Sequence, residues 1–279
     1  MSPDSESVPI LKLLDDSDEV YRTIQPELIR RGVAIVPRLR DIAANGSALE
    51  AARAQETLQK IACDASRKRL GEIIESKESE IDLERSVFAV ALSGYPELDP
   101  RPCAELLDLF AFELNSRIDL EAPAEEILSM FGKYVAEEKR FSVNTESFHD
   151  PDNNYFNKVL ERRKGLPVSV LLVYLFLGTR LNLPVEGIAL PSSFLVRLRL
   201  DDRESFIDPY EGGRALTREA CMEKFARARQ PIPEELFVPA SPAQMLSRML
   251  NNLAVAYREH REEAYADHFE TLCDLLNGQ

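Results

Sequence analysis

Two short stretches of the chain carry residue types that could perform acyl transfer. LPSSFLVRLRL, residues 190–200, is typical of a strand leaving a turn, and FIDPYEGG, residues 206–213, is typical of a strand ending in a tight Asp-Pro turn. An aspartate placed like Asp208 can orient a catalytic base on the preceding strand. That strand offers only Ser192 and Ser193, and a serine hydroxyl cannot act as a base near neutral pH. The two stretches therefore predict either an unusual active site or one that has lost its base.

The apolar segment GLPVSVLLVYLFLG predicts a buried helix that is entered through Gly165 and Pro167. Free N–H groups at a helix start can activate a nucleophile and hold an oxyanion. Ser169 lies in the first turn of this helix, and His149 is the one histidine near it in the sequence. Ser169 is therefore a candidate nucleophile paired with His149, or a residue that caps the helix start, and we favour capping.

Polar residues just before this helix form a candidate binding set. The set is Asn157, Glu161, Arg162, Arg163 and Gly165. Its arginines sit at a predicted helix end, where they either bond to terminal carbonyls or recognise a ligand or partner. Asp208 also has a structural alternative, because an aspartate before a proline can bond to the backbone two residues on.

These motifs follow one another in a familiar order. The stretch DPDNNYFNKVLERRKGLPVSVLLVYLFLGTRLNLPVEGIALPSSFLVRL, followed by FIDPYEGG, resembles the SirB family of bacterial transglutaminase-like proteins. The shared features are the VLExRxGxP block, the long helix, the GxxLPxxFLVR strand and the DPYxGG turn. The same module occurs in a eukaryotic F-box protein. The resemblance covers residues 85–276, including SPAQMLSRMLNNLAVAY, which is similar to the family's tail leading into tetratricopeptide repeats.

The resemblance implies a transglutaminase-like fold but only part of its catalytic triad. Transglutaminase-like enzymes use a Cys at the helix start, a His on the first strand and an Asp on the next. The matching positions hold Pro167, Ser193 and Asp208, so the acid alone remains. The resemblance thus implies that these three positions are vestigial, because a lone acid cannot carry out acyl transfer.

Hydrophobic periodicity predicts an α+β protein that is mostly helical. We expect HEAT-like helices, or a small helical bundle, in residues 1–78. Residues 79–238 are expected to form the transglutaminase-like domain with a small antiparallel sheet. Residues 239–279 predict a tetratricopeptide-like helical hairpin.

The composition narrows the classes of partner. With 34 basic and 48 acidic residues, the net charge of −14 disfavours binding to nucleic acid or to an anionic membrane. The longest apolar run is well below the roughly 18 residues of a membrane span. The four cysteines are far apart in the sequence, which suggests reduced thiols and a cytoplasmic location. No metal motif is present, and we expect no cofactor.

Two functions remain open from the sequence. The first is a non-catalytic, protein-binding or regulatory module that holds a protein partner through its helical flanks. The alternative is a hydrolase or acyltransferase with a rebuilt site, using Ser169 or Ser193 with Asp208.

Overall fold

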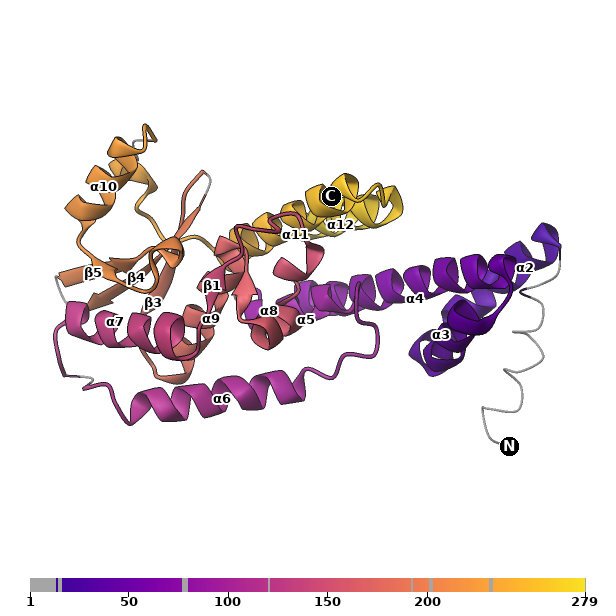
Figure 1. The fold of residues 1–279 in the computed structure, drawn as a ribbon, viewed down its shortest axis with the longest axis horizontal. Coiled ribbons are helices and arrows are strands. Elements are labelled where there is room, and N and C mark those ends of the chain that lie inside the picture. Colours follow the sequence, from indigo (N-terminus) through magenta and orange to yellow (C-terminus); the bar gives the residue numbers. More distant parts are fainter. Residues whose placement is uncertain are drawn as a thin grey trace. The chain divides into compact units, whose positions relative to one another are not determined.

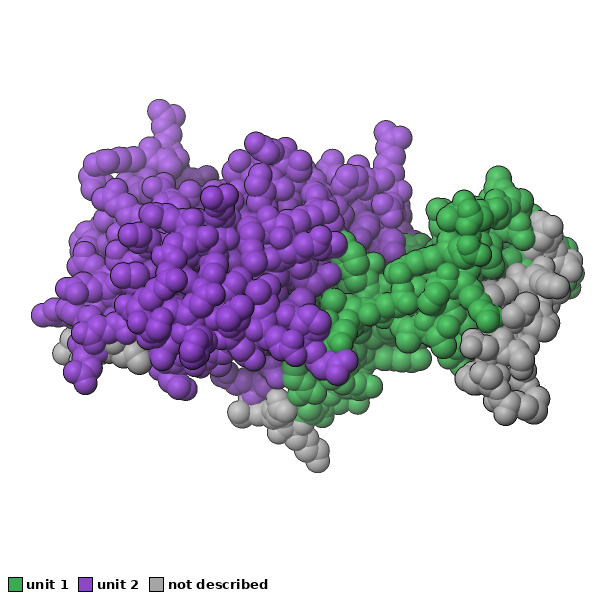
Figure 2. All heavy atoms as spheres, turned by 60° about the horizontal axis from the view of Figure 1, so that its bottom comes forward, with its two compact units in different colours: residues 1–79, 85–99 green, residues 80–84, 100–279 purple. Residues whose placement is uncertain are grey.

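The computed structural model describes Leu14 and residues 17–76, 80–119, 121–191, 193–200, 203–230 and 233–278. Ser192 lies outside the described residues. The chain forms two compact units, one of residues 1–79 with 85–99 and one of residues 80–84 with 100–279 (Figure 1 and Figure 2). The predicted class is confirmed, since helices dominate and the larger sheet is antiparallel. The predicted domain boundaries after residues 78 and 238 stay predictions.

Three helices make up most of the first unit: α2 (Asp18–Arg31), α3 (Val36–Asn45) and α4 (Ala48–Glu75). The hydroxyl of Ser17 accepts a bond from the N–H of Val20 and so caps α2. Ser47 and Glu50 form a reciprocal capping box at the start of α4. Gly32, at a φ of 59°, ends α2 in a backbone conformation that favours glycine. The HEAT-like character of these helices stays a prediction.

Most of α5 (Leu83–Ala91) belongs to the first unit, and the second unit contains the elements that follow it in the chain. Its helices are α6 (Arg101–Asn115), α7 (Ala124–Gly132), α8 (Phe156–Arg162), α9 (Pro167–Arg180), α10 (Arg218–Arg227), α11 (Pro242–Glu259) and α12 (Glu263–Leu276). Its strands are β1 (Ser142–Val143), β2 (Lys164–Gly165), β3 (Val185–Ala189), β4 (Phe194–Leu200), β5 (Arg203–Ile207) and β6 (Ala215–Leu216). Among the described residues, no helix combines the length and the apolarity needed to cross a membrane.

The core of the second unit is α9 and the sheet against which it packs. Every residue from Pro167 to Gly178 is buried. The sheet has the order β3-β4-β5-β6 and is antiparallel throughout, and α9 packs on β3 and β4. Leu195 of β4 and Phe206 of β5 join a second apolar cluster with Cys221 of α10. Both faces of β4 are therefore covered, and every residue from Phe194 to Leu198 is buried.

A contact between two glycines fixes the turn after β5. A Cβ atom on Gly132, at the end of α7, would lie 1.8 Å from the carbonyl oxygen of Gly213. Gly213 has a φ of 82°, and a Cβ there would lie 2.3 Å from the carbonyl oxygen of Gly132. Two backbones therefore approach more closely here than any side chain permits. The contact pins the segment that follows Asp208 to α7.

The C-terminal hairpin is joined to the core by aromatic residues. Ser241 and Gln244 form a capping box at the start of α11. Within the hairpin, the ring of Tyr257 stacks on that of Tyr265, with 4.5 Å between the centroids. The hydroxyl of Tyr257 lies 2.9 Å from the hydroxyl of Tyr155 and so connects the hairpin to the core. The predicted hairpin is present as two packed helices, and its tetratricopeptide-like character stays a prediction.

The glycine contact leads to a prediction about stability. Gly132→Ala should lower the free energy of unfolding by about 3 kcal/mol, because the methyl group must displace the backbone at Gly213. The matched control is Gly71→Ala in α4, where a Cβ would meet nothing within 4 Å. This substitution should raise helix stability by about 0.5–1 kcal/mol. Urea denaturation of both variants would test the account, and equal effects would contradict it.

Candidate functional site

The start of α9 is held by backbone bonds and by its proline. The N–H of Leu166 donates to the carbonyl oxygen of Asn153 at 3.0 Å. The N–H of Asn144 donates to the carbonyl oxygen of Gly165 at 2.9 Å. Pro167 occupies the first helical turn, where its missing N–H costs no hydrogen bond. The predicted entry through Gly165 and Pro167 is thus confirmed.

Ser169 makes neither of the contacts predicted for it. Its side chain is fully buried, and its hydroxyl has no hydrogen-bond partner among the described residues. The favoured capping role is therefore wrong. The ring of His149 packs edge-on against that of Phe148, with 5.6 Å between the centroids, and makes no hydrogen bond to Ser169. Among the described residues, no base contacts the Ser169 hydroxyl.

Asp208 is buried and both of its carboxylate oxygens are occupied. Oδ1 accepts a bond from the N–H of Tyr210 at 2.9 Å, and Oδ2 accepts one from Nζ of Lys224 at 2.6 Å. Lys224 also pairs with Glu211 at 2.9 Å. Burial alone would lower the pKa of Lys224, but its bonds to Asp208 and Glu211 outweigh that effect and raise the pKa. The carboxylate therefore stabilises its own turn and anchors α10. The bond from Tyr210 is the one that an aspartate before a proline can accept from the backbone two residues on.

The register of the sheet carries Ser193 and Asp208 to the same end of the β4–β5 pair, because Val196 lies opposite Ile207. The hydroxyl of Ser193 is buried, and its hydrogen-bond contact is a long one of 3.4 Å to the carbonyl oxygen of Phe194. No hydrogen bond links the side chains of Ser169, Ser193 and Asp208 in the part of the chain that the structure describes. The three groups share a region of the fold without forming a proton-transfer chain.

Two members of the predicted binding set are tied up in surface ion pairs. Glu161 pairs with Lys158 at 2.6 Å, and Arg162 pairs with Asp150 at 2.8 Å and also with Asp152. Exposed pairs of this kind contribute little to stability. Both charges nevertheless have a counter-ion within the chain.

The other members of the set are placed differently. Gly165 is tightly packed, since a Cβ there would lie 3.0 Å from a methyl group of Val159. The side-chain oxygen Oδ1 of Asn157 is buried and has no hydrogen-bond partner among the described residues. Arg163 ends α8 in the left-handed region, with a φ of 60°, and its guanidinium lies against two phenylalanine rings. Of the predicted binding residues, Arg163 thus has the most unusual surroundings.

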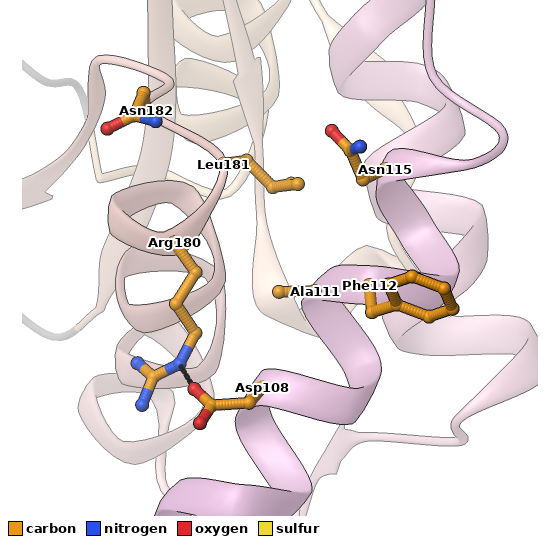
Figure 3. A pocket seen from close by; sticks show the side chains of 7 residues that line it. All are labelled: Asp108, Ala111, Phe112, Asn115, Arg180, Leu181 and Asn182. Atoms are coloured by element: carbon orange, nitrogen blue, oxygen red, sulfur yellow. Dashed lines mark hydrogen bonds and ion pairs between the residues drawn. The ribbon is translucent and has the colours of Figure 1, made fainter.

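A pocket of about 490 Å³ lies at the opposite end of α9 from the predicted site. Its lining residues are Asp108, Ala111, Phe112, Asn115, Arg180, Leu181 and Asn182. Figure 3 shows the ion pair of Arg180 and Asp108 at this pocket, with Nε and Oδ1 2.6 Å apart, and the ring of Phe112 extending away from Arg180. The motifs in the sequence do not predict this pocket. The one hint of it is that Leu109 and Phe112, two large apolar residues, lie off the buried face of α6 and are at least half exposed.

Burial keeps three of the thiols protonated. It raises the pKa of Cys63 and Cys221 to about 12 and that of Cys273 to about 11. Asp208 adds to the effect at Cys221. A thiol nucleophile needs the opposite shift. The described residues also include no group of three or more His, Cys, Asp or Glu side chains that could hold a metal ion.

Comparisons with known proteins agree with this architecture. A family model described as the transglutaminase-like superfamily matches residues 102–251. A UPF0162 protein of Xylella fastidiosa is 30% identical over 186 residues, which are 63% of this chain and 65% of that protein. A UPF0162 protein of Pseudomonas aeruginosa is 29% identical over 167 residues, or 59% of this chain and 60% of the relative. Human F-box only protein 21 is 28% identical over 149 residues, covering 50% of this chain and 23% of that protein. No solved structure matches the chain.

The geometry predicts that Asp208 acts on stability. Asp208→Asn should lower the free energy of unfolding by about 2 kcal/mol, because a buried hydrogen-bonded charge loses its pairing with Lys224. Glu211→Gln, which removes the exposed partner of the same lysine, should cost less than about 1 kcal/mol. Chemical denaturation at neutral pH measures both, and a larger loss in the Glu211 variant would contradict the assignment.

The thiol environments predict slow chemistry at neutral to mildly alkaline pH. In the native protein at about pH 8, Cys221 should react with a disulfide reagent roughly a thousandfold more slowly than in urea, because a pKa about three units higher leaves little thiolate. Mass spectrometry of the labelled peptides measures the rate. Rapid labelling of native Cys221 would show that the site opens or that the thiolate forms.

Proposed function

The chain belongs to the transglutaminase-like superfamily, and from this premise we propose that it is a non-catalytic member, of the SirB type, that acts by binding another protein. The Cys and His of the transglutaminase triad are replaced by Pro167 and Ser193 in this proposal. The protein partner is held through the helical flanks, and the role of the complex is regulatory. The net charge of −14 supports regulation through a protein and not through direct contact with DNA.

The observation that carries the proposal is the ion pair of Asp208 with Lys224. In a triad the acid accepts a hydrogen bond from the ring of the general base. Here a lysine ammonium takes that place at 2.6 Å, and the carboxylate is 2% exposed. The histidines, at positions 149, 260 and 268, all lie outside strands β4 and β5. The acid is therefore neutralised within the fold, and no base stands between it and a hydroxyl.

The alternative, a rebuilt serine hydrolase, gains no support from the same geometry. Ser169 and Ser193 are both buried, and neither hydroxyl contacts a group that could accept its proton in catalysis. Nucleophile and base must come within hydrogen-bond reach for such a mechanism.

Exposed apolar side chains on the flanks support protein binding. Val33 and Leu49 belong to the N-terminal helices, and Val255 belongs to α11; each is exposed by 45% or more. Each one alone is ordinary for a protein surface. Binding by paired helices uses such residues as anchors within a polar rim. The flanks are thus the surfaces to test first.

The absence of catalysis can be tested directly. Purified protein should give no turnover above background on a panel of esters, amides and glutamine-containing acyl donors with amine acceptors. Asp208→Asn should give the same result. Turnover by the wild type that is lost in this variant would overturn the proposal.

Partner binding can be tested with matched substitutions. When the protein is crosslinked to its partner in cells and purified, Val33→Asp and Val255→Asp should each weaken partner capture about tenfold or more, because each places a charge in an apolar contact. Leu109→Asp on α6 is the control, since Leu109 is as exposed but lies outside the flanks. Quantitative mass spectrometry of the captured complex gives the readout. If Leu109→Asp abolishes capture while Val33→Asp and Val255→Asp do not, the partner binds near α6 and not on the flanks.

A further inference from the structure

Arg163 has its guanidinium held against two buried aromatic rings. Its Cζ atom lies 4.9 Å from the ring centroid of Phe110 and 4.8 Å from that of Phe141. The backbone is fixed as well, because the carbonyl oxygen of Arg163 accepts a bond from the N–H of Ser142 at 3.0 Å. A planar cation stacked in this way loses much of its freedom before any ligand arrives. The position of the charge is therefore preorganised.

This cation has no counter-ion in the described chain. Nη1 of Arg163 is buried and has no hydrogen-bond partner, and no carboxylate forms an ion pair with the side chain. The nearest acid in the sequence, Glu161, pairs instead with Lys158. Burial lowers the pKa of Arg163, which reflects the cost of partly removing its charge from water. An unpaired, partly buried guanidinium is unusual in a chain with 48 acidic residues.

A second cation beside the same ring is already neutralised. Nζ of Lys139 lies 4.6 Å from the ring centroid of Phe110 and 2.6 Å from a carboxylate oxygen of Glu113. Lys139 follows the π-helical turn Lys133–Glu138, and its N–H donates to the carbonyl oxygen of Tyr134 at 2.9 Å. Turns of this rare type are frequent at functional sites. Glu113 thus balances Lys139, and the charge of Arg163 is left over.

We propose that Arg163 is the docking point for a single carboxylate side chain of the protein partner, an inference that rests on the proposed function. A carboxylate carries one negative charge and so balances the single unpaired positive charge at Arg163. Guanidinium and carboxylate form paired, charge-assisted hydrogen bonds when both are planar and oriented. The partial exposure of Arg163 suits a side chain presented on another protein's surface.

The test uses the full chain and a capped peptide that carries one glutamate among uncharged residues, followed by NMR at low salt. The peptide should shift the Nε–H resonance of Arg163 in a saturable way. Arg163→Lys and Arg163→Gln should each weaken peptide binding about tenfold or more, since lysine keeps the charge but loses the planar, stacked geometry. Arg199→Gln, which removes an exposed positive charge from β4, is the matched control and should bind as the wild type does. If Arg163→Gln fails to fold, Arg163→Lys decides the question.

Three results would overturn the inference. The first is binding by both Arg163 variants equal to that of the wild type. The second is an equal loss in the Arg199 variant, which would show a general charge effect. The third is tighter binding of free acetate or inorganic phosphate than of the peptide at Arg163, which would assign the site to a small anion.

This test separates the inference from the proposed function. Failure of the peptide to bind, with partner capture still lost in the flank variants, removes the inference alone. Turnover that depends on Asp208 removes the proposed function and leaves a measured peptide site at Arg163 in place.

Discussion

The burial of α9 is the constraint on which the second unit depends. A helix that is apolar on all sides from Pro167 to Gly178 must be covered on all sides. The sheet packs on one face through β3 and β4, while α6, α8 and α11 pack elsewhere on the helix. Each of these elements carries an apolar surface that α9 completes. The fold therefore holds the motifs of the chain together whether or not they still perform chemistry.

Polar groups around this core bond to other parts of the chain and so serve the structure. The carboxylate of Asp208 bonds to its own turn and to Lys224. The glycine contact between α7 and the turn fixes the same segment from the other side. Among the described residues around this core, buried polar atoms without a hydrogen-bond partner remain on Asn154, Asn157, Arg163 and Ser169. The side chain of Ser169 is fully buried, whereas that of Arg163 is partly exposed.

The sequence predicted the elements better than it predicted their contacts. Apolar runs and Pro or Gly punctuation located α9, β4 and β5, because these signals are local. The partner of Asp208 could not be foreseen, since Lys224 lies on another helix and is brought close only by the packing of α10. Arg163 was in the predicted binding set, but its stacking on Phe110 and Phe141 depends on residues distant in the sequence. The capping role of Ser169 was wrong because its buried hydroxyl neither accepts a bond from a backbone N–H nor donates one among the described residues.

The proposed function requires that the described residues include no activated nucleophile. The most direct measurement is the intact mass of the native protein after incubation with a serine-directed fluorophosphonate and, separately, with an electrophilic glutamine analogue. The account predicts an unchanged mass with both reagents, because Ser169 and Ser193 lack a base and Asp208 is held by Lys224. A single covalent adduct on either serine, formed by the folded protein and absent after Asp208→Asn, would contradict it.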